Sequence, residues 1–467
     1  MLKRLFSHSA IYGLAPQIPK IVGILVLPII TAHLTKLDFG IFGLITAVSG
    51  SIAAFANLGL NVVLSNSFYK SPMRYKIAWR QIYGFLILWN IPYAFLLAGI
   101  IWYFIPIEAA SNTWNIILLN TIPIVFFGPT SIMGSLYYQL SQRPVPIVVR
   151  GAIVGFLTIG LNVYFIAFRE MGYMGWFLSA AIGQMAIQLT YWVPLNRSIK
   201  ITPIFNFKWR FIRRQLAVSL PTVPHYYSAY LLNTSDRLVM KLVNISTGNI
   251  GLYNAANTVG NIMLMMGNAS GQAIGPMLLK AYKASDEYLA RRLVFSLQIT
   301  FFLATFLSSI WLKEIFYILI KNNGLNKVYP LGIIIVMAYN YRPMYFGANS
   351  RLFYHERTKI LLKVTFLAGI STLLLNFIFI PFWGYEVAAY TTFIGLMYMG
   401  YAGYFLREFK QNCDVNYYPF RWLTITIILT LVAYFVVEWS IILKLLISGI
   451  TLLIAFLSVK RVNLNEE

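Results

Sequence analysis

Runs of about 20 apolar residues, separated by short polar breaks, recur along this chain of 467 residues. An α-helix needs a run of that length to cross the hydrocarbon of a bilayer. No segment between the runs resembles a soluble domain. The pattern predicts an all-α integral membrane protein with about 14 transmembrane helices, at 9–32, 39–66, 77–104, 113–139, 145–168, 173–195, 217–244, 249–279, 293–320, 329–354, 359–381, 384–406, 419–438 and 440–459.

The composition agrees with this assignment. Hydrophobic residues make up 59% of the chain and charged residues 11%, whereas a soluble domain carries roughly 25% charged residues to cover its surface. A soluble enzyme is therefore excluded. The single cysteine, Cys413, allows no internal disulfide and no cysteine metal cluster.

The net charge of +23 is explained mainly by orientation in the membrane. In the helix map, 27 of the 37 Lys and Arg residues fall on one side, which the positive-inside rule identifies as cytoplasmic. Both termini are predicted to be cytoplasmic, and nucleic-acid binding becomes a poor hypothesis. The basic segments on this side are 3–4, 70–80, 143–150, 197–214, 280–292, 351–363, 407–421 and 460–461.

The first six predicted helices repeat in the next six. Short motifs recur in the same order, at separations between 205 and 214 residues. Internal repeats are common in transporters, and an even number of helices gives both halves the same orientation. The matched pairs include Pro16 and Pro221, Gly40 and Gly251, Pro129 and Pro343, and Asn162 and Asn376.

The repeat predicts two parallel six-helix bundles plus two C-terminal helices. The expected parts are an N-terminal bundle at 1–195, a basic cytoplasmic linker at 196–216, a second bundle at 217–410, and an extra helix pair with a tail at 411–467. The two bundles are expected to face each other across a central cavity.

Several ionisable residues fall at membrane depth, where they are costly and often functional. Lys20 and Arg342 lie too deep to reach the interface easily, so a water-filled cavity is the favoured interpretation. His225 is either a packed histidine or a substrate contact. Asp236 and Arg237, being sequence neighbours, are expected to point in different directions and to need partners elsewhere, and a structural salt bridge is an equal alternative.

Polar amides mark the second and eighth helices. Asn57 lies on the second helix, and Asn257 and Asn268 belong to a helically spaced stripe on the eighth. The stripe serves either hydrogen bonding between helices or the lining of a cavity that contacts sugar hydroxyls.

The sequence contains no nucleotide-binding loop, metal-ligand cluster or nucleophile with a nearby base, so we expect no catalytic residues, no metal and no cofactor. A membrane interior with several cations and one deep carboxylate instead suits an anionic cargo.

The chain also resembles a known group. Leu34–Phe42 and Asn57–Leu60 in the first half, with Asn233–Met240 and Ile250–Ala256 in the second, are similar to the polysaccharide transporters of the multidrug/oligosaccharidyl-lipid/polysaccharide exporter superfamily. Among these the chain looks most like the O-antigen-unit flippases.

The resemblance implies a flippase for undecaprenyl-diphosphate-linked oligosaccharides in the bacterial inner membrane, coupled to an ion gradient. It implies the bilayer and the lipid-linked oligosaccharide as partners, with polymerase and chain-length proteins as further ones. Asp236 becomes the ion-coupling candidate. The substrate-binding candidates are Lys20, Arg342, Arg237, His225, Asn57, Asn257 and Asn268.

Two alternatives stay open. A drug exporter of the same superfamily would typically have twelve helices and an acidic cavity. A membrane polymerase or ligase of the polysaccharide pathway would require a large outward loop with catalytic arginines, and the outward loops here are short.

Overall fold

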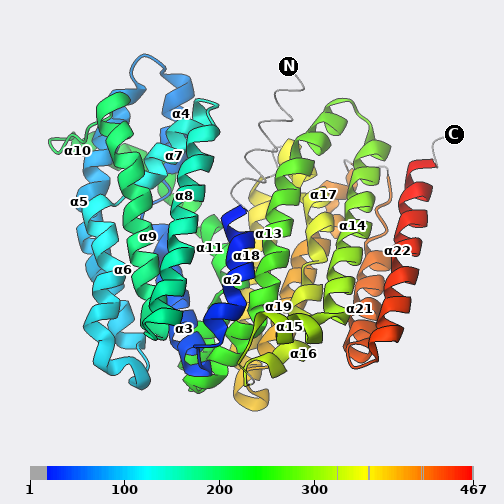
Figure 1. The fold of residues 1–467 in the computed structure, drawn as a ribbon. Coiled ribbons are helices and arrows are strands. Elements are labelled where there is room, and N and C mark those ends of the chain that lie inside the picture. The colour runs from blue at the N-terminus through cyan, green and yellow to red at the C-terminus, as the bar shows by residue number, and fades with distance from the viewer. Residues whose placement is uncertain (1–17, 323, 356–357, 412, 414, 465–467) are drawn as a thin grey trace. The chain divides into compact units, whose positions relative to one another are not determined.

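The computed structural model describes residues 18–322, 324–355, 358–411, 413 and 415–464. The chain forms two compact units, residues 1–230 and 231–467. Helices are the only regular secondary structure in the described residues of both units (Figure 1).

The described part of the first unit contains nine α-helices, α2 to α10, and the start of α11, which continues into the second unit. Its elements are α2 (Ile18–Thr31), α3 (Lys36–Ile52), η2 (Ala53–Phe55), α4 (Asn61–Lys70), α5 (Tyr75–Phe104), η3 (Ile107–Asn112), α6 (Thr113–Phe127), α7 (Thr130–Leu140), α8 (Val145–Asn162), η4 (Val163–Phe168), α9 (Tyr173–Val193), η5 (Pro194–Ser198), α10 (Trp209–Ser219), η6 (Leu220–Thr222) and α11 (Val223–Asn233).

The second unit begins at Leu231, within α11. Its elements are α12 (Ser235–Leu242), α13 (Thr247–Lys283), α14 (Glu287–Ile310), α15 (Leu312–Leu319), η7 (Asn326–Val328), α16 (Tyr329–Ala338), α17 (Tyr341–Tyr354), α18 (Thr358–Trp383), α19 (Val387–Tyr401), η8 (Ala402–Phe405), α20 (Arg407–Gln411), α21 (Pro419–Val436) and α22 (Ile441–Leu464).

Within the described residues, eight helices are long and apolar enough by themselves to cross a membrane. Several other predicted spans are built from two shorter helices. The predicted span at 39–66 is interrupted after α3, and the one at 329–354 is divided between α16 and α17. The predicted all-α membrane fold is confirmed, and some of its predicted spans contain a helix break.

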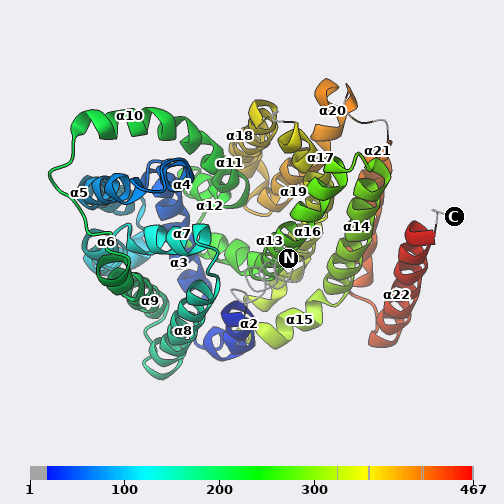
Figure 2. The ribbon, with the colours of Figure 1, turned by 90° about the horizontal axis from the view of Figure 1, so that it is seen from above.

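Helix α10 differs from its neighbours in direction. In the view from above it lies lengthwise, whereas α5 and α9 are seen end-on (Figure 2). Ile212 is buried against the core of the first unit, while Arg210, Arg213 and Arg214 are exposed. A basic amphipathic helix of this kind suits a membrane surface. It overlaps the segment 196–216, which the sequence identifies as a basic linker and which lies inside the first unit.

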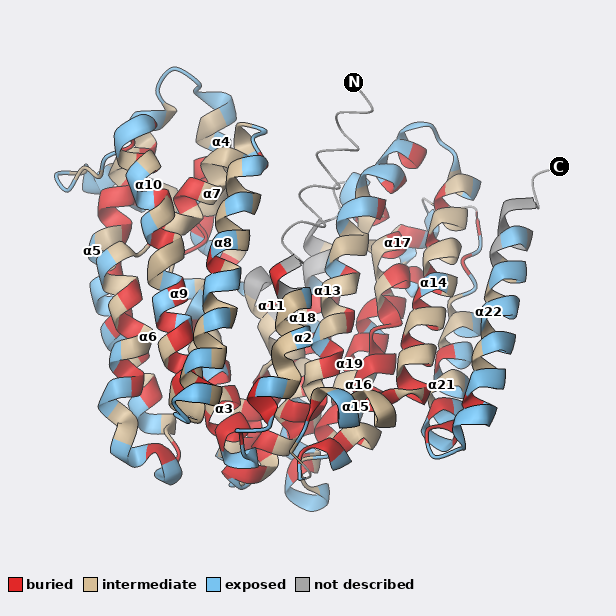
Figure 3. Ribbon diagram, in the orientation of Figure 1, coloured by how far each residue is buried: buried red, intermediate tan, exposed pale blue. Residues whose placement is uncertain are grey.

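The core of the second unit is centred on α16. All residues from Leu331 to Ala338 are buried, and α13, α14, α19 and α21 pack around this helix (Figure 3). By contrast, α22 exposes a row of large apolar side chains, as expected for a helix that faces lipid.

The two units repeat one close helix contact. Thr158 on α8 donates to Val154 O at 2.8 Å, and Thr372 on α18 donates to Ala368 O at 2.9 Å. Each hydroxyl lies against a glycine of the next helix. A Cβ added at Gly183 would lie 2.3 Å from Thr158 Oγ1, and one added at Gly395 would lie 1.9 Å from Thr372 Oγ1. Small residues allow such close helix packing in membranes.

The helix starts and turns repeat as well. Thr35 caps α3 by accepting from Asp38 N, and Ser246, 211 residues later, caps α13 by accepting from Asn249 N. The turns before the sixth and twelfth predicted helices both contain a glycine with positive φ, 54° at Gly172 and 76° at Gly384. The sequence repeat therefore corresponds to repeated local structure.

Candidate functional site

A buried helix break positions Arg342. Helix α16 ends at Ala338 and α17 begins at Tyr341. Asn340, at the break, is fully buried; its carbonyl accepts from Gln298 Nε2 at 3.1 Å, and its Nδ2 donates to Thr305 Oγ1 at 2.8 Å. Both partner side chains come from α14. Broken backbone at membrane depth needs partners of this kind, so α14 fixes where α17 starts.

Arg342 is the second residue of α17 and is half-buried. Its Nη1 donates to Asn268 Oδ1 at 3.1 Å, and its guanidinium carbon lies 5.3 Å from the centre of the Tyr341 ring. Its stem lies against Gly267, where an added Cβ would come within 3.1 Å of Nε. The glycine therefore makes room for the arginine.

The charge of Arg342 has no anionic partner in the described part of the chain. None of the ion pairs found there includes Arg342, and its Nε is buried without a hydrogen bond. An amide and an aromatic face compensate a buried cation only in part. Such a group favours the approach of an anion.

Helix α13 presents a polar face beside this arginine. Asn261, Asn268 and Gln272 are exposed, and their spacing of seven and four residues places them on one side of the helix. Amide groups exposed to hydrocarbon would lose their hydrogen bonds at high cost. This face therefore suits contact with water. Asn257 is half-buried, and its Nδ2 donates to Tyr253 O of its own helix at 3.0 Å.

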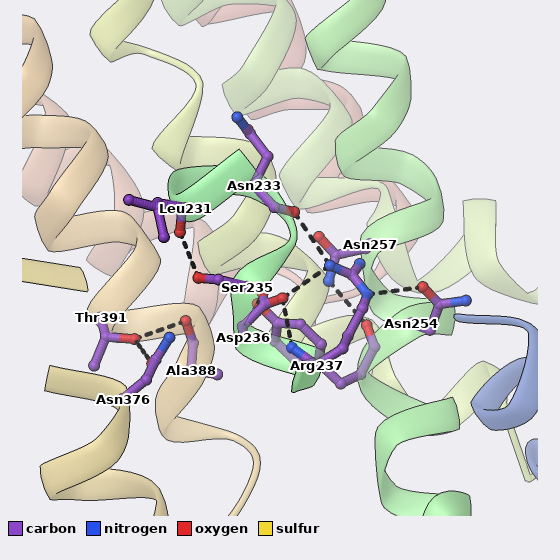
Figure 4. A network of polar contacts seen from close by, with 11 residues as sticks. Leu231, Asn233, Ser235, Asp236, Arg237, Asn254, Asn257, Asn376, Ala388 and Thr391 are labelled. Carbon is purple, nitrogen blue, oxygen red and sulfur yellow. Dashed lines mark hydrogen bonds and ion pairs between the residues drawn. The ribbon is translucent and has the colours of Figure 1, made fainter. Parts of the chain in front are cut away.

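Asp236 and Arg237 form a separate buried cluster at the start of α12 (Figure 4). Arg237 Nη1 lies 2.9 Å from Asp236 Oδ1 and also donates to Asn233 O at 3.1 Å. Arg237 Nε donates to Asn254 Oδ1 at 3.1 Å, and Tyr253 OH donates to the other carboxylate oxygen of Asp236. The cluster is held by many internal contacts.

Asp236 and Arg237 do have partners elsewhere, Tyr253 and Asn254 on α13, but the expectation that the two side chains point in different directions was wrong, and the alternative of a salt bridge is what the structure shows. The helix is interrupted at Thr234, between α11 and α12, and both residues occupy the first turn of α12. There Asp236 Oδ1 also accepts the backbone N–H of Arg237 at 2.8 Å, which turns the carboxylate toward its neighbour. A carboxylate at a helix N-terminus is electrostatically favoured.

Asn57 lies in a helix break of the first unit, not on a continuous helix. Its Oδ1 accepts from Gly59 N at 3.1 Å, and φ is 50° at Leu58 and 70° at Gly59. Its repeat counterpart, 211 residues later, is Asn268 on the continuous helix α13. The backbones of Lys20 and His225 lie in α2 and α11, but both side chains fall outside the described residues.

The structure thus brings Arg342 and Asn268 into contact and places Asp236, Arg237 and Asn254 in a second cluster. Sequence reasoning missed Gln298, Thr305 and Asn340, which support the break before Arg342. The signal for them was present: three polar residues in otherwise apolar spans. No group of three or more His, Cys, Asp or Glu among the described residues could hold a metal ion.

A family model described as polysaccharide biosynthesis protein matches residues 6–282 of the chain. No curated protein matches the chain in sequence.

Three solved structures resemble the fold. Lipid II flippase MurJ in an inward closed conformation has a TM-score of 0.62 at 13% identity, covering 93% of this chain and 99% of its own. An inward-facing multidrug resistance MATE family transporter of the MOP superfamily has a TM-score of 0.55 at 12% identity, covering 86% and 93%. The Vibrio cholerae MATE transporter VcmN in the bent form has a TM-score of 0.52 at 13% identity, covering 88% and 100%.

Proposed function

The chain belongs to the polysaccharide biosynthesis protein family, and we propose that it is a flippase for lipid-linked oligosaccharides. It moves undecaprenyl-diphosphate-linked repeat units of O-antigen or a related surface polysaccharide from the cytoplasmic to the periplasmic leaflet. Transport proceeds by alternating access and is coupled to an ion gradient. The fold shared with a lipid flippase and with exporters supports transport as the activity.

The observation that carries this proposal is the state of Arg342. Its guanidinium is held by the neutral amide of Asn268, beside the polar face of α13, in a helix pair that the sequence predicts to span the membrane. A lone cation at mid-membrane costs on the order of 3 kcal/mol on insertion scales. A guanidinium can bind phosphate oxygens through two parallel hydrogen bonds. The diphosphate of the cargo supplies the missing anion.

A groove in the second unit supports a cargo with a lipid chain. It has a volume of about 680 Å³ and lies among α14, α21 and α22. Phe302, Ile425 and Ile450 are among its apolar lining residues, and Arg421 lies at the N-terminal end of α21. An apolar groove of this size can take up part of a polyprenyl chain.

The remaining features follow from the same proposal. The protein lies in the bacterial inner membrane with both termini cytoplasmic, in accord with the distribution of Lys and Arg. Polymerase and chain-length proteins of the pathway receive the flipped unit. Lys20 and His225 are further candidates for cargo contact, and Asp236 remains the candidate for ion coupling.

A multidrug exporter is the second candidate, because MATE transporters share the fold. Cationic drugs require an acidic site. The cation at Arg342 without a carboxylate partner in the described residues favours an anionic cargo. An enzyme of the polysaccharide pathway is less favoured, since the similar structures named above are transporters and a flippase.

The test is complementation of a strain that lacks this transporter, with surface polymer and membrane protein both measured. We expect Arg342→Ala and Lys20→Ala to block polymer export at normal protein level, and Arg342→Lys to retain part of it. Arg143→Ala, at an exposed arginine, is the control and keeps full export. Normal polymer in both alanine variants would refute the cationic site. Drug sensitivity without a polymer defect in the null strain would favour the exporter.

A further inference from the structure

The helix break at Asn57 borders a cavity to which the proposed function assigns no role. The cavity has a volume of about 270 Å³ and lies within the first unit. We call it the tyrosine cavity. Its lining residues are Gly50, Ala53, Ala54, Asn57, Tyr227 and Tyr230.

The break that borders the tyrosine cavity is locked in place. Helix α3 ends at Ile52, and the chain turns through Leu58 and Gly59, both with positive φ. A Cβ added at Gly59 would lie 2.5 Å from Thr222 Oγ1 and 2.6 Å from Ser219 O. Only glycine fits this approach of the turn to η6. This turn also holds the side chain of Asn57, whose Oδ1 accepts a hydrogen bond from Gly59 N.

Two tyrosines from α11 form the aromatic wall. The Tyr227 hydroxyl donates to Ser51 O, and the Tyr227 and Tyr230 ring centres are 6.2 Å apart in an edge-to-face arrangement. The Tyr230 ring lies against Gly50, where an added Cβ would be 3.4 Å away. Small residues at 50, 53 and 54 therefore keep the space beside the rings open.

The chemistry of the lining points to a neutral polar ligand. No charged side chain lines the tyrosine cavity, so it offers nothing to balance a diphosphate. Aromatic faces accept the apolar C–H face of a sugar ring, while amide and hydroxyl groups bond its hydroxyls. Asn57 Nδ2 makes no hydrogen bond within the described part of the chain and is available as a donor.

The size of the tyrosine cavity limits the ligand to one ring. Pockets for drug-sized ligands occupy roughly 300–1,000 Å³, and this cavity is smaller. We propose that the tyrosine cavity binds one neutral sugar residue of the lipid-linked cargo. This inference rests on the proposed function and adds to it a sugar-recognition site separate from the arginine that attracts the diphosphate.

The experiment compares two lipids bound to the purified full chain in nanodiscs. One is undecaprenyl diphosphate without sugar, and the other is the undecaprenyl-diphosphate-linked unit extracted from a strain that lacks the transporter. We expect the wild type to bind the sugar-bearing lipid at least about tenfold more tightly. Tyr230→Ala removes this preference, and Tyr230→Phe keeps it because the ring remains.

A cavity-filling variant provides an independent check. Ala54→Leu places a larger side chain in the tyrosine cavity and is expected to reduce the preference as well. Tyr103→Ala, at an exposed tyrosine outside the cavity, is the matched control. The inference is overturned if the wild type shows no preference, or if Tyr230→Ala and Ala54→Leu both preserve it. Failure of the wild type to bind either lipid overturns the proposed function itself, so the two failures are distinguishable.

Discussion

Arg342 Nη1 donates a hydrogen bond to Asn268 Oδ1 at 3.1 Å, so a neutral amide holds the guanidinium. An amide positions the guanidinium and leaves its charge uncompensated. A carboxylate at the same place would form a stronger, charge-assisted bond. The difference between these two partners gives a direct way to separate positioning from charge.

We expect Asn268→Asp to abolish most transport, at least about tenfold, because the new carboxylate neutralises Arg342 and competes with the diphosphate. Asn268→Ser, which removes the amide without adding charge, is expected to reduce transport only a fewfold. The measurement is surface polymer in a complemented null strain at equal protein level. Equal effects of the two substitutions would show that geometry, not charge, is what matters at this position.

We expect Arg237→Ala to act on folding. Removing one partner of a buried pair leaves an uncompensated charge and costs about 3–5 kcal/mol. The amount of folded protein in the membrane should therefore fall, unlike that of Arg342→Ala. The double variant Asp236→Asn with Arg237→Gln removes both charges and should recover part of the loss. Thermal unfolding in detergent measures the stability of Arg237→Ala, Arg342→Ala and the double variant. A normal level of Arg237→Ala together with lost transport would instead assign Arg237 to the cargo site.

The glycine contact repeated in both units predicts a specific packing defect. Gly395→Ala should destabilise the protein by about 1–3 kcal/mol, as overpacking usually does, because its Cβ would overlap Thr372 Oγ1. Adding Thr372→Ala removes that oxygen and should restore part of the stability. Gly449→Ala is the matched control: no atom lies within 4 Å of the added Cβ on α22. The measurement is the unfolding temperature of the wild type, Gly395→Ala, the double variant and Gly449→Ala. An unchanged unfolding temperature in Gly395→Ala would contradict the prediction.

An ion pair between α15 and the connection from α21 to α22 should make a small, pH-dependent contribution to stability. Lys313 donates to Glu438 at 2.6 Å, and Tyr329 donates to the other oxygen of Glu438. These hydrogen bonds hold the pKa of Glu438 below its ordinary value and raise the pKa of Lys313. Glu438 is exposed, so we expect only about 0.2–1 kcal/mol, as for surface pairs.

The sign of this effect follows from the two shifts. A lowered glutamate pKa stabilises the fold above the ordinary glutamate value and loses this effect as the pH falls below it. A raised lysine pKa stabilises below the ordinary lysine value and loses the effect as the pH rises through the folded value. Glu438→Gln should therefore lower the unfolding temperature at pH 7, and the difference from wild type should shrink in acid. A difference independent of pH would contradict this account.

Reporter fusions test the orientation. Fusions at residues 200 and 460 are expected to report the cytoplasm, because most Lys and Arg residues fall on that side of the helix map. A periplasmic signal from either fusion would overturn the map.

The sequence was sufficient for the fold class, because apolar length and charge distribution depend on composition along the chain. It also indicated the repeat, which reappears at Thr158 and Thr372. It did not predict the breaks at Asn57 and Asn340, because apolar residues surround both and the side chains that satisfy the second break come from another helix. For the Asp236–Arg237 pair the sequence left the salt bridge as one of two alternatives, because it did not show that a new helix starts at Ser235.

The segment α3–α4 is broken, whereas its counterpart α13 is continuous, so one half of the chain cannot simply replace the other. A synthetic gene made of two copies of the second half would reproduce the Thr372–Gly395 contact twice and would retain the packing that this contact serves. It would also carry two arginines at the Arg342 position and no tyrosine cavity. The repeated contact therefore belongs to the scaffold that both halves share, whereas the two candidate ligand sites depend on features that are not repeated, the helix break at Asn57 and the side chain of Arg342.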